Sequence, residues 1–153
     1  MTWAIVRIRG KVRRPPAVTD TLRMLRLTRQ NHCVIVPETP AYRGMVQKVK
    51  DFVTWGEVSP ELVAKLLLKR GGITDAAMKA NSRFKSVWDF SQALTKGEAT
   101  LADVKGLKPV LRLHPPRGGF EGAKRPYHDR GALGYRGKEI NELLDRMIFE
   151  EAA

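Results

Sequence analysis

The spacing of apolar and polar positions predicts alternating strands and helices in the first third of the chain. Residues 3–9 (WAIVRIR) alternate as a strand does, and the short runs 32–36 and 52–55 have the β-branched and aromatic content of two further strands. Between them, apolar residues recur at helical spacing from about Val18 and again after Pro40. The predicted order is β-α-β-α-β.

The second of these helices contains a glycine at an unexpected place. Thr39 and Pro40 form a strong helix start, because threonine accepts a hydrogen bond from a free amide and proline needs no donor at the first helical position. Gly44 then lies beyond the first turn, where glycine costs about 1 kcal/mol relative to alanine. A helical wheel places it opposite the apolar stripe. Its neighbours on that exposed side are Arg43, Gln47, Lys48 and Lys50. Two explanations stay open: a tolerated glycine on a solvated face, or close approach by the backbone of a polyanion.

Charge then narrows the class of partner. The chain has 153 residues, 42% of them hydrophobic, which suffices for one domain with a real core. Its net charge is +12, which favours nucleic acid as a partner and an anionic membrane surface second. Residues 1–58 carry +7, 59–106 carry +3, 107–137 carry +5 and 138–153 carry −3. The first and third segments are therefore the candidates for facing a polyanion.

Candidate chemistry is sparse. The single cysteine, Cys33, excludes an internal disulfide and a multi-cysteine zinc site, and we expect it to be a small core residue. His32, His114 and His128 show no metal-ligand spacing, so we predict no metal, cofactor or catalytic site. A nuclease built from distant histidines stays formally open but has no positive support. The chain has no apolar run of 18 residues and no signal peptide at its start, which predicts a cytoplasmic protein.

Four stretches together resemble a known family. They are the strand WAIVRIR, the basic loop GKVRRPP, the helix around DTLRMLRL and, most specifically, ETPAYRGMVQKV. The chain resembles the L-thirty family of large-subunit ribosomal proteins, in which a T-P-A-x-R-G-M signature opens the second helix. Residues 59–106, the loop HPPRGGFEG and the segment KEINELLDRM are similar to the C-terminal extension of archaeal and eukaryotic members. No basic helix precedes the first strand, so the resemblance is to the archaeal type. Arg26 departs from it, because bacterial members often have a glycine there that ends the first helix.

The resemblance implies a fold, a function and partners. The fold is α+β: a small three-stranded sheet with two helices on one face, related to ferredoxin-like folds, plus a helical and basic-loop extension. The function is that of a structural, non-enzymatic constituent of the large ribosomal subunit that binds ribosomal RNA. The implied partners are this RNA, with the small five-S rRNA as a further candidate, and neighbouring ribosomal proteins, at one copy per ribosome rather than as a homo-oligomer. A free RNA-binding factor or chaperone acting off the ribosome is the alternative.

The extension has readable elements of its own. Ser59 and Pro60 begin a helix, and residues 109–113 (PVLRL) could form an additional strand that returns to the sheet. Residues 114–137 are rich in glycine and proline, with basic and aromatic residues interleaved, which suits RNA contact but also permits a plain linker. The last helix carries a broad apolar stripe, for which we expect docking on the protein's own core, with contact to a neighbouring protein as the alternative.

The sequence thus predicts three segments of the chain and one set of RNA-binding residues. Residues 1–58 form the predicted core unit, 59–106 a helical extension, and 107–153 a strand, a basic loop and a helix that packs back on the core. The residues expected to contact RNA are Arg7, Arg9, Lys11, Arg13 and Arg14 on the first strand and loop; Arg43, Gly44, Gln47 and Lys50 on the second helix; and Arg117, Lys124, Arg125 and Tyr127 in the extension.

Overall fold

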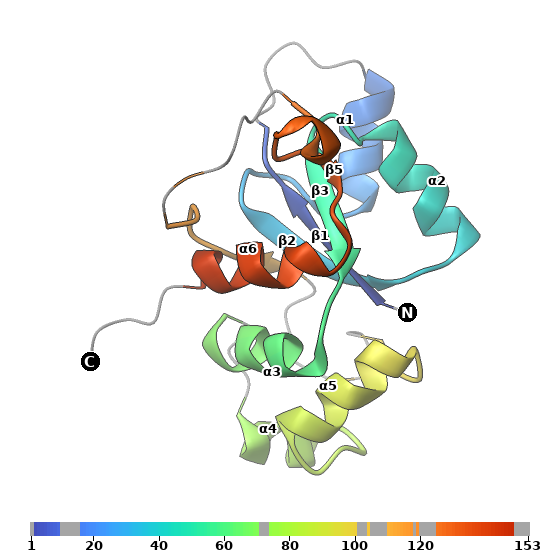
Figure 1. The fold of residues 1–153 in the computed structure, drawn as a ribbon. Helices are drawn as coiled ribbons and strands as arrows, with labels where there is room; N and C mark the ends of the chain where they lie inside the picture. The colour runs from blue at the N-terminus through green and yellow to red at the C-terminus, as the bar shows by residue number, and fades with distance from the viewer. Residues whose placement is uncertain are drawn as a thin grey trace.

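The protein is a sheet with helices on both faces (Figure 1). The structure is a computed structural model, and it describes residues 2–9, 16–70, 74–100, 104, 110–117, 119 and 125–148. In chain order the elements are β1 (Thr2–Arg7), α1 (Pro16–Met24), β2 (His32–Pro37), α2 (Pro40–Lys48), β3 (Val53–Glu57), α3 (Pro60–Lys69), α4 (Asp75–Asn81), α5 (Val87–Lys96), β4 (Leu111–Arg112), β5 (Gly134–Tyr135) and α6 (Ile140–Met147), with 3-10 turns η2 (Tyr127–Asp129) and η3 (Gly137–Glu139) on either side of β5. The predicted β-α-β-α-β order is confirmed.

The sheet has five strands in the order β4-β2-β1-β3-β5, rather than the three predicted. β1 lies in the centre, antiparallel to both β2 and β3. The additional strand expected within 109–113 is confirmed as β4, which pairs with β2 through Cys33 and Leu111. β5 was not predicted, because a strand of two residues is too short to show a period of two. It pairs in parallel with β3 through Thr54 and Gly134.

The first face of the sheet is covered by α1 and α2, as predicted. Trp3 and Ile5 point from β1 into a buried cluster with Leu22 of α1 and Val46 of α2. α2 begins as its sequence indicates, with the Thr39 hydroxyl accepting a hydrogen bond from the amide of Tyr42 at 3.3 Å.

The end of α1 explains the departure at Arg26. The amide of Arg26 donates to the carbonyl of Arg23 at 2.9 Å, and the amide of Leu27 donates to the carbonyl of Leu22 at 2.8 Å. This hydrogen-bond pair is that of a Schellman motif, which requires a left-handed residue after the helix. Arg26 adopts it with φ of 63°. The helix therefore ends here even though the residue is not glycine.

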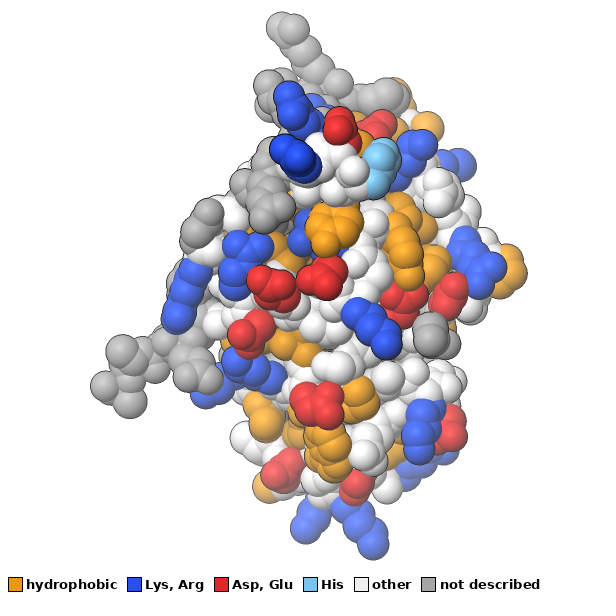
Figure 2. Space-filling model, in the orientation of Figure 1, with side chains coloured by type: hydrophobic (Ala, Val, Ile, Leu, Met, Phe, Trp, Pro, Cys, Tyr) orange, Lys and Arg blue, Asp and Glu red, His pale blue; other side chains and the backbone are white. Residues whose placement is uncertain are grey.

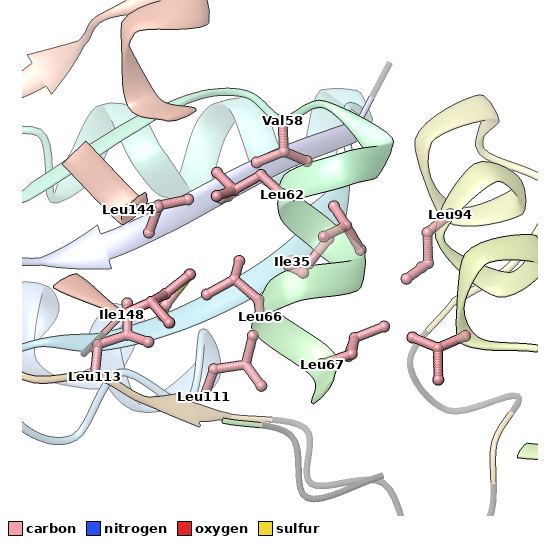
Figure 3. Packing of buried hydrophobic residues seen from close by; sticks show 14 of the residues in the cluster. Ile35, Val58, Leu62, Leu66, Leu67, Leu94, Leu111, Leu113, Leu144 and Ile148 are labelled. Atoms are coloured by element: carbon pink, nitrogen blue, oxygen red, sulfur yellow. The ribbon is translucent and has the colours of Figure 1, made fainter. Parts of the chain in front are cut away.

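The second face of the sheet is covered by the extension. Ala4, Val6, Cys33 and Ile35 point away from α1 and α2 into a cluster with α3, α5 and α6. Figure 3 shows Leu62 and Leu66 of α3 beside Ile35 and Leu67 turned toward the side of Leu94, with Leu111, Leu113, Leu144 and Ile148 closing the same core. The apolar stripe of α6 is fully buried, so the expected docking of the last helix on the protein's own core is confirmed. Both faces of the central strands are thus inside the protein.

The return of the chain to β3 depends on a glycine. A Cβ at Gly56 would lie 2.0 Å from the carbonyl oxygen of Gly137, so only glycine lets η3 approach β3 this closely. Asn141 fixes the same junction, since its side chain accepts from the amide of Ser59 at 2.9 Å and donates to the carbonyl of Glu57 at 3.2 Å. The extension is therefore attached to the edge of β3 by backbone contact and by specific hydrogen bonds.

Candidate nucleic-acid interface

The exposed face of α2 is basic, as the helical wheel predicts. Val46 and Val49 are buried against the sheet, whereas Arg43, Gly44 and Gln47 are exposed. Lys48 and Lys50 are exposed as well. Arg43 forms an ion pair with Glu38 at 2.7 Å, and its side chain is still 60% exposed to solvent. This face can therefore present positive charge to a partner.

Gly44 lies in open space. An added Cβ would meet no atom within 4 Å, apart from its own helix backbone and chain neighbours. Its φ is not in the left-handed region either. Neither internal packing nor backbone conformation requires a glycine at this position, which leaves the two explanations that the sequence allows.

Arg7 does not lie where an RNA-contacting residue would lie. Its residue surface is only 2% exposed, and its guanidinium donates to the carbonyl of Leu27 at 2.8 Å and to the carbonyl of Arg9 at 2.9 Å. The prediction is wrong because Arg7 shares a strand face with Trp3 and Ile5, and α1 and α2 cover that face. Arg7 instead joins β1 to the loop after α1, and we remove it from the proposed RNA surface.

Arg9 is close to the end of α2. Its guanidinium lies over the ring of Phe52, 5.5 Å from the ring centre, and donates to the carbonyl of Asp51 at 3.4 Å. Arg9, Gln47 and Lys50 line one surface cleft of about 460 Å³, together with five residues of the extension: Pro126, His128, Leu133, Gly134 and Tyr135. The structure thus brings together three predicted residues from the first strand and the second helix. Lys11, Arg13 and Arg14 of the adjoining loop lie outside the described residues.

The predicted residues of the extension separate into two places. Arg125 is exposed beside the cleft residue Pro126. Tyr127 is partly buried, with the guanidinium of Arg136 over its ring at 4.9 Å, so one face of this ring is already covered within the protein. Arg117 is exposed near the end of α6, where its amide donates to the carbonyl of Arg146 at 3.1 Å. Lys124 lies outside the described residues.

A second basic site at the opposite edge of the sheet was not predicted. His32 and Arg112 pair across β2 and β4, and Arg112 is exposed. Burial, followed by the charges of Arg112, Arg29 and Arg7, lowers the pKa of His32 below its usual 6.5. The alternation of Leu111, Arg112 and Leu113 could have revealed the outward arginine, but only if the pairing of β4 had been known. Neither Arg29 nor Arg112 takes part in the side-chain ion pairs Asp20–Arg23, Glu38–Arg43 and Lys65–Asp145 that are seen among the described residues.

The described residues offer little for catalysis. Cys33 is fully buried in the core, as expected, and burial raises the pKa of its thiol to about 12, which suppresses the thiolate. Among the described residues, no three His, Cys, Asp or Glu side chains come together in a way that could hold a metal ion. Within that same part of the chain, no helix has both the length and the apolar character needed to cross a membrane.

Comparison with known proteins agrees with this geometry. Residues 3–53 match the family model described as "Ribosomal protein L30p/L7e". The large ribosomal subunit protein uL30 of Methanopyrus kandleri is 51% identical over 149 residues, which cover 92% of this chain and all of that protein. The uL30 proteins of Methanoculleus marisnigri and Archaeoglobus fulgidus are 47% and 46% identical, each over 95% of this chain and 99% of their own length. Because this similarity extends over the sheet, both helical layers and the extension, the chain belongs to the uL30 (L30p/L7e) family of ribosomal proteins.

Proposed function

We propose that this chain is a structural constituent of the large ribosomal subunit that binds and clamps ribosomal RNA. It is not an enzyme, and it acts in the cytoplasm within the ribosome. Its partners are large-subunit ribosomal RNA and neighbouring ribosomal proteins.

The observation that carries the proposed contact is the basic face of α2. A Cβ added at Gly44 would meet no atom within 4 Å beyond its own helix backbone and chain neighbours, and Arg43, Gln47 and Lys50 are exposed on the same helix and the turn after it. A residue without a side chain lets a sugar-phosphate backbone approach the helix itself, while guanidinium and ammonium groups on either side pair with phosphates. Arg9 and Arg125 extend the same charge toward β5. Lys11, Arg13, Arg14 and Lys124 stay predictions for this surface, and Tyr127 would take part through its uncovered ring face.

Arg29 and Arg112 support a second contact at the β2–β4 edge, whereas Arg117 stays a predicted RNA contact near the end of α6. Arg112 lies on the edge strand β4, and Arg9, Gln47 and Lys50 line the cleft beside β5, the opposite edge strand, so a rigid protein could hold two RNA segments at a fixed separation. Holding two RNA segments at a fixed separation is what we mean by clamping the RNA. We also propose that residues 1–58, 59–106 and 107–153 act as one folded unit. Side chains from all three segments pack in the core on the second face of the sheet.

Salt dependence tests the proposed function. Each phosphate contact releases counterions, so the logarithm of the affinity for large-subunit rRNA fragments should fall linearly with the logarithm of salt concentration. Arg43→Ala should lower the slope of this dependence by about one, the change expected when one phosphate contact is lost. An affinity that changes little over a several-fold rise in salt would contradict the proposal. The five-S rRNA is the second RNA to titrate in the same assay, and quantification of the protein in purified subunits measures the proposed single copy.

Sedimentation separates a ribosomal constituent from a free RNA-binding factor. A constituent should stay on large subunits washed in high salt, because many contacts must break together. A factor or chaperone acting off the ribosome should be stripped by the same wash.

A further inference from the structure

The cleft between α2 and β5 has the composition of a binding pocket. Its volume is about 460 Å³, within the range of roughly 300–1,000 Å³ that is usual for pockets holding small ligands. One wall is formed by the end of α2 and the turn after it, with Gln47, Lys50 and Asp51. The other wall is formed by Pro126, His128 and Tyr135 of the extension. Figure 2 shows hydrophobic side chains reaching the surface between α2 and the β5 region, with Lys, Arg and His side chains nearby.

The floor of the cleft is aromatic and apolar. Phe52, Trp55 and Leu133 line it and are each less than a tenth exposed. Tyr135 stands above this floor and is 51% exposed, with its ring centre 6.3 Å from that of Trp55 and the two planes inclined by 47°. An exposed aromatic ring beside a buried one offers a flat surface on which another ring can stack.

Tyr135 is held in place before any ligand arrives. Its hydroxyl donates a hydrogen bond to the carboxylate of Glu57, and this bond raises the pKa of the phenol to about 12. Its backbone is fixed as well, since β5 pairs with β3 and the amide of Arg136 donates to the carbonyl of Trp55 at 2.9 Å. A ring that is already fixed loses little conformational freedom when a second ring stacks on it.

The rim of the cleft supplies the groups that a nucleotide needs. Arg9 and Lys50 line the cleft and supply positive charge that can pair with a phosphate. Gln47 and Asp51 supply amide and carboxylate groups that can hydrogen-bond the edge of a base. The adjoining cleft of about 300 Å³ fits an anion less well, because Glu38 and Glu57 line it against one arginine, Arg43.

We propose that the α2–β5 cleft binds one unpaired RNA base, stacked on Tyr135, with its phosphate held by Arg9 and Lys50. This inference rests on the proposed RNA-binding function and adds a specific site to it. The family model ends at residue 53, whereas Trp55, Leu133 and Tyr135 lie beyond it. The site is therefore complete only where the extension has returned to the edge of β3.

Nuclear magnetic resonance can detect this site without ribosomal RNA. We would titrate the full chain, labelled with ¹⁵N, with the four nucleoside 5′-monophosphates and with ribose 5-phosphate as a phosphate-only control. We expect the monophosphates to shift the Trp55 indole signal and the backbone amides of Phe52 and Tyr135, while ribose 5-phosphate leaves the indole signal unmoved. Equal shifts with ribose 5-phosphate would reduce the cleft to a phosphate site and overturn the proposal, as would the absence of shifts with any monophosphate.

A variant that fills the cleft tests its use in RNA binding. Gln47→Phe adds a ring at an exposed position that lines the cleft, without altering the buried core. The control Ala80→Phe adds the same ring at an exposed position of α4, outside the cleft. We expect Gln47→Phe to weaken binding to large-subunit rRNA by about fivefold or more, the equivalent of losing one stacked base, and Ala80→Phe to leave the affinity unchanged.

The failure of this proposal can be told apart from failure of the proposed function. If Gln47→Phe binds rRNA as tightly as the unaltered chain while Arg43→Ala still reduces the salt dependence, the cleft proposal is wrong and RNA binding stands. If neither variant changes the binding, both are wrong.

Discussion

The guanidinium of Arg7 donates a hydrogen bond to the backbone carbonyl of Leu27, with Nη1 2.8 Å from the oxygen. This contact joins the central strand to the loop after α1, inside the protein. An arginine that sequence patterning places among RNA-binding residues thus has a structural role.

Arg7→Met should destabilise the free protein. The substitution keeps a long side chain but removes the donors to the carbonyls of Leu27 and Arg9. We expect the free energy of unfolding to fall by about 2–4 kcal/mol, measured by urea denaturation. The exposed Arg43→Met is the matched control, with a change below about 1 kcal/mol. An Arg7→Met protein of unaltered stability that had lost one unit of salt dependence in RNA binding would restore Arg7 to the RNA surface.

Gly44→Ala should separate stability from binding. Because an added methyl group meets no atom within 4 Å and alanine is the better helix former, the free energy of unfolding should stay the same or rise by up to about 1 kcal/mol. The affinity for large-subunit rRNA should fall, since the methyl group would occupy the space of the approaching backbone. A less stable protein with unaltered RNA affinity would show that this glycine has a structural role instead.

Arg26→Gly should stabilise α1. Arg26 adopts a φ of 63° at the C-terminal cap, a conformation that glycine takes without the steric cost that a Cβ imposes. Glycine also loses more chain entropy on folding, so the net gain in the free energy of unfolding should be about 0.5–1 kcal/mol. Arg26→Ala removes the same charge but keeps the Cβ, and should bring no such gain. Equal stabilisation by both variants would assign the effect to charge rather than to backbone conformation.

Stability should fall as His32 becomes protonated. Burial and the charges of Arg112, Arg29 and Arg7 lower the pKa of His32 in the folded protein, whereas the unfolded chain keeps a value near 6.5. Below pH 6.5 the unfolded state therefore binds a proton that the folded state resists, so the free energy of unfolding decreases as the pH falls toward the folded pKa. His32→Gln should flatten this decrease when urea denaturation is followed from pH 7.5 to pH 5. If the variant kept the full pH dependence, other groups would be responsible.

The sequence predicted those elements whose signals are local. The Thr39 and Ser59 caps, the apolar stripe of α6 and the exposed side of α2 all depend on neighbours within a few turns of chain, and the structure confirms each of them. β5 and the burial of Arg7 depend instead on contacts between distant segments. Thr54 and Gly134 are 80 residues apart, and a two-residue strand is too short for its periodicity to predict their pairing. The cleft was missed for the same reason, because Trp55 and Tyr135 acquire a common surface only when the extension returns to β3.

The last prediction concerns the face of the sheet that the extension covers. In a fragment of residues 1–58, Val6, Cys33 and Ile35 would be exposed to water, because their packing partners come from α3, α5, β4 and α6. We expect this fragment to self-associate or to unfold without cooperativity in denaturation and analytical ultracentrifugation. Truncation after residue 148 is the control and should leave the described core intact. Replacing Val6 and Ile35 with threonine in the fragment should reduce its self-association, since the open face then carries polar groups. A fragment that is monomeric and unfolds cooperatively without these changes would show that the core unit does not need the extension to fold, and the proposal of one folded unit would be wrong.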